Sequence, residues 1–270
     1  MKRVGFADFY LSEWHANNYP RWMAQANEKL GLDYQLCYAW AERDVSPLDG
    51  VTTDEWCCKM GAERCQTLAE LAQKSDVLFI LAPSDPDRHL PYARELLPFG
   101  KPTYIDKTFA PDLTTAQEIF RIAGEHGTPF FSTSALRYAK ELEQFADASC
   151  LTILGGGSNF DEYCIHLIEM AVMLLKSPVR SVRVEHQGIQ RHCRLTLEDG
   201  QTATLLYAPS AAYEILAQDA QGKGMRALLS SDFFPRLLEE ILHFFETRRP
   251  PFDPAQTLTV MSLRDQCTRG

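Results

Sequence analysis

The first half of the chain alternates short apolar runs with amphipathic segments, and this alternation constrains the fold more than any other feature. Strands that alternate with helices of ten to fifteen residues are typical of right-handed βαβ units on a parallel sheet. Ser12 is expected to cap the first helix, which ends at Gly31. The pattern predicts an α/β fold that begins with a Rossmann-type, doubly wound parallel sheet over residues 1–133. Its strands are expected at residues 2–7, 34–40, 77–82, 103–105 and 129–132.

Past Arg137 the pattern changes to one of antiparallel strands. A glycine run at residues 155–157 precedes a helix expected over residues 161–175, and a last amphipathic helix is expected over residues 235–247. The second part, residues 134–270, is predicted to be a smaller α+β domain with a mostly antiparallel, open sheet. Its strands are expected at residues 179–186, 193–197 and 202–207.

Charge and composition exclude several partners. Lys and Arg number 27 against 36 Asp and Glu, a formal net charge of −9 that repels nucleic acid and anionic membranes. No stretch approaches the roughly 20 apolar residues of a membrane span, and no apolar leader opens the chain, so we expect a cytoplasmic protein. The eight cysteines include no Cys-x-x-Cys pair and are expected to be reduced, structural thiols.

The turn after the first strand departs from the usual phosphate-binding pattern. Such a turn carries three glycines, which let the backbone approach a dinucleotide pyrophosphate at the helix N-terminus. Here those positions fall at or near Asp8, Tyr10 and Glu13, so two carboxylates stand where phosphate would lie. On the second strand the acidic residue that would hold the ribose is replaced by Trp40, with Glu42 as the nearest substitute.

Two later segments carry polar residues at the carboxyl ends of strands, where open α/β sheets bind ligands. One runs from Pro83 to His89, and the other is Tyr-Ile-Asp-Lys-Thr, which includes Asp106 and Lys107. A lysine at such a strand end can donate a proton to a substrate oxygen or remove one. The alternative is that Lys107 is simply ion-paired with Asp106, and the residues alone leave both interpretations open.

A third segment places polar side chains on one face of a helix. Glu162, His166 and Glu169 follow a four- and three-residue spacing, and two carboxylates beside one histidine would orient it for acid–base chemistry. A metal site is less favoured, because no other His or Cys has suitable spacing. The motif at residues 15–20, His-Ala-Asn-Asn-Tyr-Pro, is interpreted as ordinary helix surface, with a ligand-binding role as the alternative.

With these motifs in view, the chain resembles the glucose-fructose oxidoreductase / inositol dehydrogenase / MocA family of NAD(P)-dependent oxidoreductases. The resemblance is carried by the loop at residues 83–89, by an Asp-Lys-Thr version of the family's Glu-Lys-Pro motif, by residues 134–138, by the glycine run with its Glu-x-x-x-His-x-x-Glu, and by Leu-Glu-Asp-Gly at residues 197–200. The stretch between Arg137 and Gly155 is short for the family's strand insertion, which implies a reduced substrate domain.

The resemblance implies roles for individual residues. Lys107 and His166, helped by Glu162, would handle the proton while hydride passes between a sugar or cyclitol carbon and NAD or NADP. The implied cofactor-binding residues are Asp8, Tyr10, Trp40, Pro83, His89 and Asp106, and the implied substrate-binding residues are Arg137, Tyr138 and Asp161. It also implies a homo-oligomer that covers the open sheet.

Three functions follow from these observations. The first is an NAD(P)-dependent oxidoreductase that acts on a sugar, cyclitol or related polyhydroxylated molecule, which requires Asp8 and Glu13 to point away from the phosphates. The second is a cofactor-independent lyase, epimerase or hydrolase-like enzyme that uses Lys107 and His166. The third is a non-catalytic ligand-binding or regulatory protein, which the presence of Lys107, Glu162 and His166 disfavours.

Overall fold

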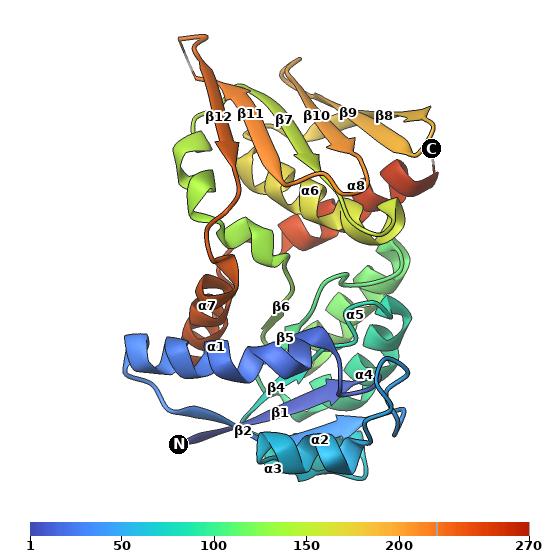
Figure 1. Cartoon of the computed structure of the whole chain (residues 1–270), viewed down its shortest axis with the longest axis vertical. Helices are drawn as coiled ribbons and strands as arrows, with labels where there is room; N and C mark the ends of the chain where they lie inside the picture. The colour runs from blue at the N-terminus through green and yellow to red at the C-terminus, as the bar shows by residue number, and fades with distance from the viewer. Residues whose placement is uncertain (220, 270) are drawn as a thin grey trace. The chain divides into compact units, whose positions relative to one another are not determined.

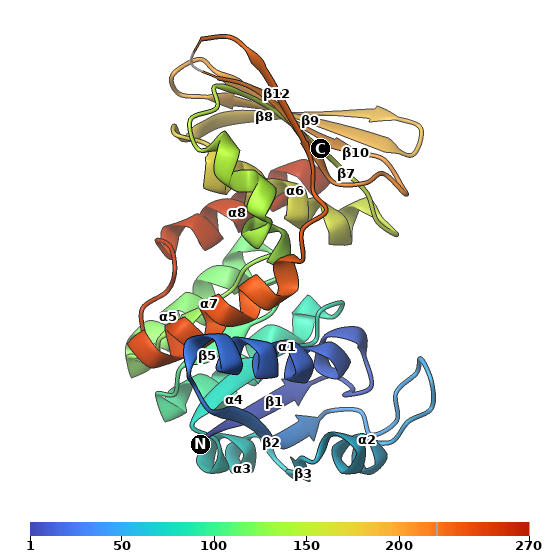
Figure 2. The ribbon, with the colours of Figure 1, turned by 60° about the vertical axis from the view of Figure 1, so that its left-hand side comes forward.

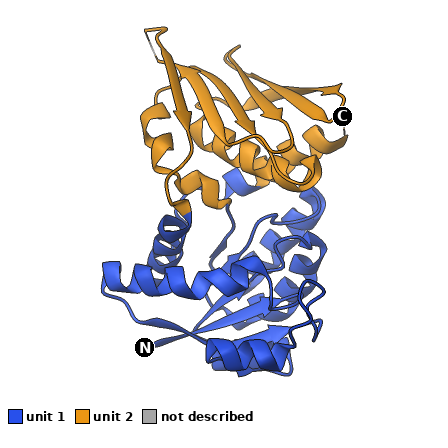
Figure 3. Ribbon diagram, in the orientation of Figure 1, with its two compact units in different colours: residues 1–133, 234–257 blue, residues 134–233, 258–270 orange. Residues whose placement is uncertain are grey.

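The computed structural model describes residues 1–219 and 221–269, which divide into two compact units (Figure 3). Unit 1 comprises residues 1–133 and 234–257, and unit 2 comprises residues 134–233 and 258–269. The first boundary between the units lies between Thr133 and Ser134. Among the described residues, no helix is long and apolar enough to cross a membrane.

Unit 1 is built on a six-stranded sheet in the order β3-β2-β1-β4-β5-β6, and each pair of neighbours is parallel (Figure 1). The order reverses between β1 and β4, which is the doubly wound arrangement, so the predicted fold is confirmed. The strands are β1 (Lys2–Asp8), β2 (Tyr34–Ala41), β3 (Glu63–Arg64), β4 (Val77–Ile80), β5 (Thr103–Ile105) and β6 (Phe130–Phe131).

Helices cover both faces of this sheet. Helices α3, α4 and α5 pack in a row on one face, and α1 and α7 contribute aromatic rings to the other. The helices of this unit are α1 (Trp14–Leu30), α2 (Thr53–Met60), α3 (Leu68–Lys74), α4 (His89–Leu96), α5 (Leu113–His126) and α7 (Phe233–Thr247), with short 3-10 turns η1 (Pro86–Arg88) and η2 (Leu97–Phe99).

The core of unit 1 is aromatic, and it explains where α7 belongs. Phe79 on β4 is fully buried and lies 6.0 Å from the Tyr19 ring on α1 and 5.4 Å from the Phe245 ring on α7, measured between ring centroids. Helix α7 comes late in the chain, within the range assigned to the second domain from the sequence. Its apolar face instead packs on the first sheet. The Phe245 ring contacts Phe79 of β4, and the Phe244 ring contacts Phe131 of β6.

Unit 2 is built on a second six-stranded sheet in the order β12-β11-β7-β10-β9-β8. Among its described strands only β7 and β10 pair in parallel, so the mostly antiparallel sheet is confirmed. Figure 2 shows α6 and α8 on one side of this sheet. The elements are η3 (Ala135–Tyr138), η4 (Lys140–Phe145), β7 (Cys150–Gly155), α6 (Phe160–Leu174), β8 (Val179–Gln187), β9 (Gln190–Leu197), β10 (Thr202–Tyr207), β11 (Glu214–Gln218), β12 (Gly224–Leu228) and α8 (Ala255–Arg269).

Several of these elements were not expected from the sequence. Strand β7 lies in the short stretch between Arg137 and the glycine run, and α8 follows the amphipathic helix at residues 235–247. Helix α8 is rich in Thr, Gln, Ser and Arg and lacks a clear apolar stripe, so its periodicity gives little signal. Its buried residues include Val260, Met261 and Leu263.

Candidate functional site

Asp8 ends β1 and is 1% exposed. Its Oδ1 accepts hydrogen bonds from the backbone N–H of Phe9 at 2.7 Å and of Ala82 at 3.0 Å, so the side chain joins the ends of β1 and β4. Ala82 itself has a φ of 53°, an unusual value for a residue with a Cβ. Asp8 therefore forms part of the scaffold at the strand ends.

Glu13 is the N-cap of α1, which corrects the expectation for Ser12. The Glu13 side chain accepts hydrogen bonds from the backbone N–H of His15, at 2.8 Å, and of Ala16. Ser12 instead donates its hydroxyl to Asp49 at 2.7 Å. A carboxylate suits this position, because it satisfies unpaired N–H groups and complements the positive end of the helix dipole.

Asp106 follows β5 and completes an acidic cluster with Asp8 and Glu13. Its Oδ1 accepts hydrogen bonds from the backbone N–H of Lys107 at 2.8 Å, the Tyr104 hydroxyl at 3.1 Å and the Tyr19 hydroxyl at 3.3 Å. The other oxygens of Asp8 and Asp106, both Oδ2, are buried and have no hydrogen-bond partner.

His15 lies between two members of this cluster. Its Nδ1 is 3.3 Å from Glu13 Oε2 and its Nε2 is 3.9 Å from Asp106 Oδ2, with the side chain 13% exposed. Tyr19, four residues on, is 1% exposed. The motif at residues 15–20 is therefore not ordinary helix surface, because its first and fifth residues face the strand ends.

The cluster is electrostatically crowded. Burial raises the pKa of Asp8 well above its usual range, and the charges of Glu13 and then Asp106 raise it further. The pKa of Tyr19 is raised for the same reasons, by burial and then by Asp106. A proton is thus held on Asp8 more tightly than on an ordinary aspartate, which reduces the repulsion among the three acids.

These residues do not fit a dinucleotide pyrophosphate at the β1–α1 turn. Phosphate binding there needs the N–H groups of the first helical turn, and those of His15 and Ala16 are bonded to Glu13. The requirement that Asp8 and Glu13 point away from the phosphate position is not met. Tyr10, the third residue assigned to this turn, is half-buried, and burial followed by the charge of Asp85 raises its pKa.

The end of β2 is occupied by side chains that bind one another. Trp40 packs against Tyr92 with ring centroids 5.3 Å apart. Glu42 accepts a hydrogen bond from the Tyr92 hydroxyl at 2.8 Å and forms an ion pair with Arg88 at 3.0 Å. The only acidic substitute for a ribose-binding residue is therefore engaged within the protein.

His89, which the resemblance assigns to the cofactor, connects two segments of the backbone. The ring is fully buried, and its two nitrogens contact the backbone carbonyls of Leu81 and Phe109. Burial lowers its pKa. The histidine thus ties the end of β4 to the loop after β5, which leaves no ring atom for a ligand.

Lys107 is held at the end of β5 without a carboxylate partner. Its Nζ donates to the backbone carbonyl of Pro83 at 3.2 Å, and the half-buried side chain forms no ion pair within residues 1–219 and 221–269. Asp106 bonds the backbone N–H of Lys107 instead of its amine. The Lys107–Thr108 peptide bond is cis. The simple ion pair with Asp106 is therefore wrong, and the amine is placed where strand-end ligands bind.

His166 lies on α6 in unit 2 and is bonded to a serine that sequence reasoning did not single out. Its Nδ1 is 2.7 Å from Ser134 Oγ, and that oxygen accepts a hydrogen bond from the N–H of Leu136 at 3.2 Å. The ring also contacts those of Tyr163 and Tyr213. The hydrogen bond between Ser134 Oγ and Nδ1 fixes the orientation of the His166 ring.

Arg137, which the resemblance assigns to the substrate, forms a buried ion pair with Glu169. Arg137 Nε lies 3.1 Å from Glu169 Oε2, with the side chains 5% and 6% exposed. The guanidinium compensates the charge of Glu169 and ties η3 to α6. The sequence predicts that Glu169 lies beside His166 on one face of α6. In the structure Glu169 instead pairs with Arg137, while His166 bonds to Ser134.

The remaining predicted residues lie near the start of α6 and at the end of η3. Glu162 is half-buried, and its Oε2 accepts from the N-cap residue Asn159 at 3.3 Å. Asp161 is exposed in the first turn, and its backbone carbonyl accepts from Arg264. Tyr138 is half-buried. Asp161 and Glu162 also complement the positive end of the helix dipole.

The glycine run before α6 allows close packing rather than phosphate binding. A Cβ on Gly157 would overlap the Tyr163 ring, and one on Gly156 would overlap the backbone of Ala208 and Ala211. The hydroxyl of Tyr213 donates to the carbonyl of Gly156 at 2.9 Å. The run therefore fixes the start of α6 and with it the position of His166.

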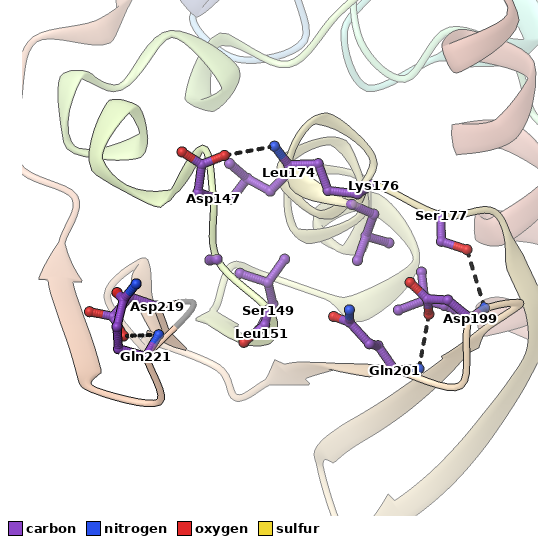
Figure 4. A pocket seen from close by; sticks show the side chains of 13 residues that line it. Asp147, Ser149, Leu151, Leu174, Lys176, Ser177, Asp199, Gln201, Asp219 and Gln221 are labelled. Atoms are coloured by element: carbon purple, nitrogen blue, oxygen red, sulfur yellow. Dashed lines mark hydrogen bonds and ion pairs between the residues drawn. The ribbon is translucent and has the colours of Figure 1, made fainter.

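A separate pocket of about 600 Å³ lies at the turn end of the unit 2 sheet (Figure 4). Lys176 on its rim forms an ion pair with Asp147 at 3.1 Å, and Asp199 caps its own turn through the N–H of Gln201 at 3.0 Å. None of the residues predicted to bind a ligand lines this pocket. The carboxylates of Asp147, Asp199 and Asp219 are bonded to groups of the surrounding loops.

Sequence reasoning missed Ser134, His15, Tyr19 and Tyr104 as members of these clusters. The signal for Ser134 was slight, because it precedes a 3-10 turn and meets His166 only in the fold. The signal for the His15 group was stronger, since an acidic residue directly before a helix start is a capping pattern.

Comparison with known proteins supports the fold but not a specific substrate. No family model matches the chain, and no curated protein matches it. Across the full length, its neighbours among solved structures are dehydrogenases of the glucose-fructose oxidoreductase / inositol dehydrogenase / MocA type, at low identity.

Three of these neighbours illustrate the likeness. UDP-N-acetylglucosamine 3-dehydrogenase from Acidithiobacillus ferrooxidans aligns with a TM-score of 0.77 and 15% identity over 99% of this chain and 97% of its own. Myo-inositol 2-dehydrogenase from Lactobacillus plantarum aligns with a TM-score of 0.79 and 13% identity over 99% and 96%. GenD2 from gentamicin A biosynthesis, solved in complex with NAD, aligns with a TM-score of 0.79 and 12% identity over 100% and 94%. At such identities the likeness shows the fold alone.

Proposed function

We propose that this chain is an enzyme that acts on a sugar, a cyclitol or a related polyhydroxylated small molecule, with Lys107 and His166 as its proton-transferring groups. The observation that carries the proposal is the position of Lys107 and the hydrogen bond of its amine. Its amine is half-buried at the carboxyl end of a parallel strand and is held by one backbone carbonyl rather than by a carboxylate. Such an amine can exchange a proton with a substrate hydroxyl.

His166 supports the proposal from unit 2. A hydrogen bond between Ser134 and Nδ1 orients the ring, and an oriented imidazole is suited to general acid–base catalysis. Ser134 is in this account a positioning residue. Glu162 and Tyr138 are retained as residues that contact the substrate or orient His166.

The comparisons favour an NAD(P)-dependent oxidoreductase as the reaction class. Two of the neighbours are named as dehydrogenases of hydroxylated compounds, and a third was solved with NAD. The hydride acceptor of that class is NAD or NADP, and the residues of the β1–α1 turn do not fit its pyrophosphate.

A second candidate is a redox-neutral lyase or epimerase, and the contacts of Glu13 favour it. An elimination of water needs a base that takes a proton from carbon and an acid that protonates the departing hydroxyl, so water leaves without an oxidant. Because the N–H groups at the start of α1 are bonded to Glu13, this class loses nothing by the altered turn.

The test is a substrate screen followed by matched variants. The protein is incubated with aldoses, cyclitols and their keto and acid derivatives, with and without NAD(P)(H), and products are followed by NMR. For any substrate found, Lys107→Ala and His166→Ala should each lower turnover by roughly a hundredfold or more. The exposed Lys59→Ala and His126→Ala serve as controls and should turn over normally. Near-native turnover in both site variants would contradict the proposal.

A further inference from the structure

The anion-binding end of α1 is occupied by a carboxylate that the chain itself supplies. Glu13 accepts the N–H groups of His15 and Ala16, which are the second and third residues of the helix. In a doubly wound fold these donors face the phosphates of a bound dinucleotide. We infer that Glu13 replaces the ligand phosphate at this helix end, and that unit 1 does not hold a dinucleotide by its β1–α1 turn.

The surroundings of Glu13 reinforce the exclusion. Asp8 and Asp106 approach the same end of the sheet, and each is 1% exposed with one oxygen lacking a hydrogen-bond partner. While Glu13 is in place, an incoming phosphate would meet the charge of Glu13 together with that of Asp106. Like charges in a partly desolvated site repel strongly.

Glu13 is also held firmly in place. It is 6% exposed, and its Oε2 lies 3.3 Å from Nδ1 of His15 in addition to the backbone bond. The His15 ring in turn contacts those of Trp14 and Tyr19. The carboxylate is therefore part of a packed cluster rather than a mobile side chain that a ligand could push aside.

The side chains at the position that would bind the adenosine ribose also bind one another. Glu42 is bonded to Arg88 and Tyr92, and the Trp40 ring packs on Tyr92. Arg88 also lies over the ring of Phe9, at 4.8 Å from its centroid, so this group joins the β1–α1 turn. The side chains at the pyrophosphate position and at the ribose position of a usual dinucleotide site are thus bonded to other residues of the chain.

The exclusion of phosphate is a property of unit 1 alone and does not depend on the proposed enzyme activity. If both hold, the combination, which rests on the proposed function, favours a reaction on a polyhydroxylated substrate that needs no dinucleotide bound at the β1–α1 turn. The two claims fail separately, because the first is measured by anion binding and the second by turnover of the Lys107 and His166 variants.

The experiment removes the Glu13 carboxylate by mutation and adds pyrophosphate to the solution. Wild type, Glu13→Gly and the charge-matched surface control Glu28→Gln are compared by thermal unfolding and calorimetry, with sodium pyrophosphate as the probe and sodium chloride at equal ionic strength as the reference. Glu13→Gly should unfold at a lower temperature than wild type, and pyrophosphate should raise its midpoint by about 2–4 °C while the other two proteins do not respond.

Every outcome decides the inference. A pyrophosphate response confined to Glu13→Gly supports it. A response in wild type, or none in Glu13→Gly, overturns it. If Glu13→Gly does not fold, Glu13→Ser keeps a short capping oxygen without the charge, and the same comparison of its response with that of wild type gives the decision.

Discussion

The carboxylate of Glu13 accepts a hydrogen bond from the backbone N–H of His15 at 2.8 Å, and the His15 ring lies 3.3 Å from the same oxygen. One acidic side chain thus both starts a helix and neutralises the anion-binding end of that helix. This relationship separates the chain from the dinucleotide-binding pattern of its fold while leaving the sheet, the strand ends and Lys107 in place.

Loss of the cap should weaken unit 1. Glu13→Ala removes the two side-chain oxygens that accept the backbone N–H groups of His15 and Ala16, and it should lower the free energy of unfolding by about 1–2 kcal/mol in urea titration. Glu28→Ala, on the exposed surface of the same helix, should stay within about 0.5 kcal/mol of wild type. Equal effects in the two variants would show that Glu13 is not a cap.

Asp8 should make stability depend on pH. Because the folded state raises the pKa of Asp8, it binds that proton more tightly than the unfolded state does. The contribution of Asp8 to stability is then full below its unfolded pKa of about 4 and falls as pH rises toward the folded pKa. Asp8→Asn keeps an oxygen for the N–H groups of Phe9 and Ala82, so it should stabilise the protein at pH 8.

The control for this prediction is the same comparison of Asp8→Asn with wild type at lower pH. The gain in thermal midpoint from Asp8→Asn should shrink as pH is lowered from 8 toward 4, since wild type then carries the proton that the amide replaces. A gain that is constant across this range, or a loss at pH 8, would mean that the pKa of Asp8 is not raised.

Replacing one partner of the buried pair Arg137–Glu169 should cost more stability than replacing both. Glu169→Gln leaves the guanidinium of Arg137 in a buried position without its countercharge and should lower the free energy of unfolding by about 3–5 kcal/mol. The double variant Arg137→Met, Glu169→Leu should recover most of that loss, as measured by chemical unfolding. If the single variant is as stable as wild type, the pair does not compensate a buried charge.

The glycine run should tolerate no side chain at its centre. A Cβ on Gly156 meets the backbone of Ala208 and Ala211, which cannot move aside as a side chain could, so Gly156→Ala should destabilise the protein by about 1–3 kcal/mol. Gly124, in helix α5, has open space around its Cβ position, and Gly124→Ala should instead stabilise by about 0.4–1 kcal/mol. Thermal unfolding of the two variants checks both signs.

The sequence predicts the first sheet well because its signals are local. The buried run at residues 77–82 and the helix that ends at Gly127 are set by apolar periodicity and by a glycine in the left-handed region, at φ 60°. Strands β11 and β12 and helix α8 were not predicted. Their side chains are mixed in polarity, and their pairing partners are distant in sequence.

The candidate site was predicted as residue types but not as partnerships. Lys107 and His166 could be named from their motifs. The hydrogen bonds of Lys107 to Pro83 and of His166 to Ser134 join residues far apart in the sequence, so local spacing does not predict them. His89 shows the converse limit, because a histidine at a strand end looks like a ligand contact until burial shows that both ring nitrogens face backbone carbonyls.

The most direct test of the central claim, that this fold lacks the usual dinucleotide contact, is calorimetric titration of the wild-type protein with NADH and with NADPH, after mass spectrometry of the purified protein for a bound nucleotide. We expect no bound nucleotide and no heat of binding up to millimolar concentration. Binding of either nucleotide with a micromolar Kd would contradict the claim and would return the protein to the dehydrogenases whose fold it shares.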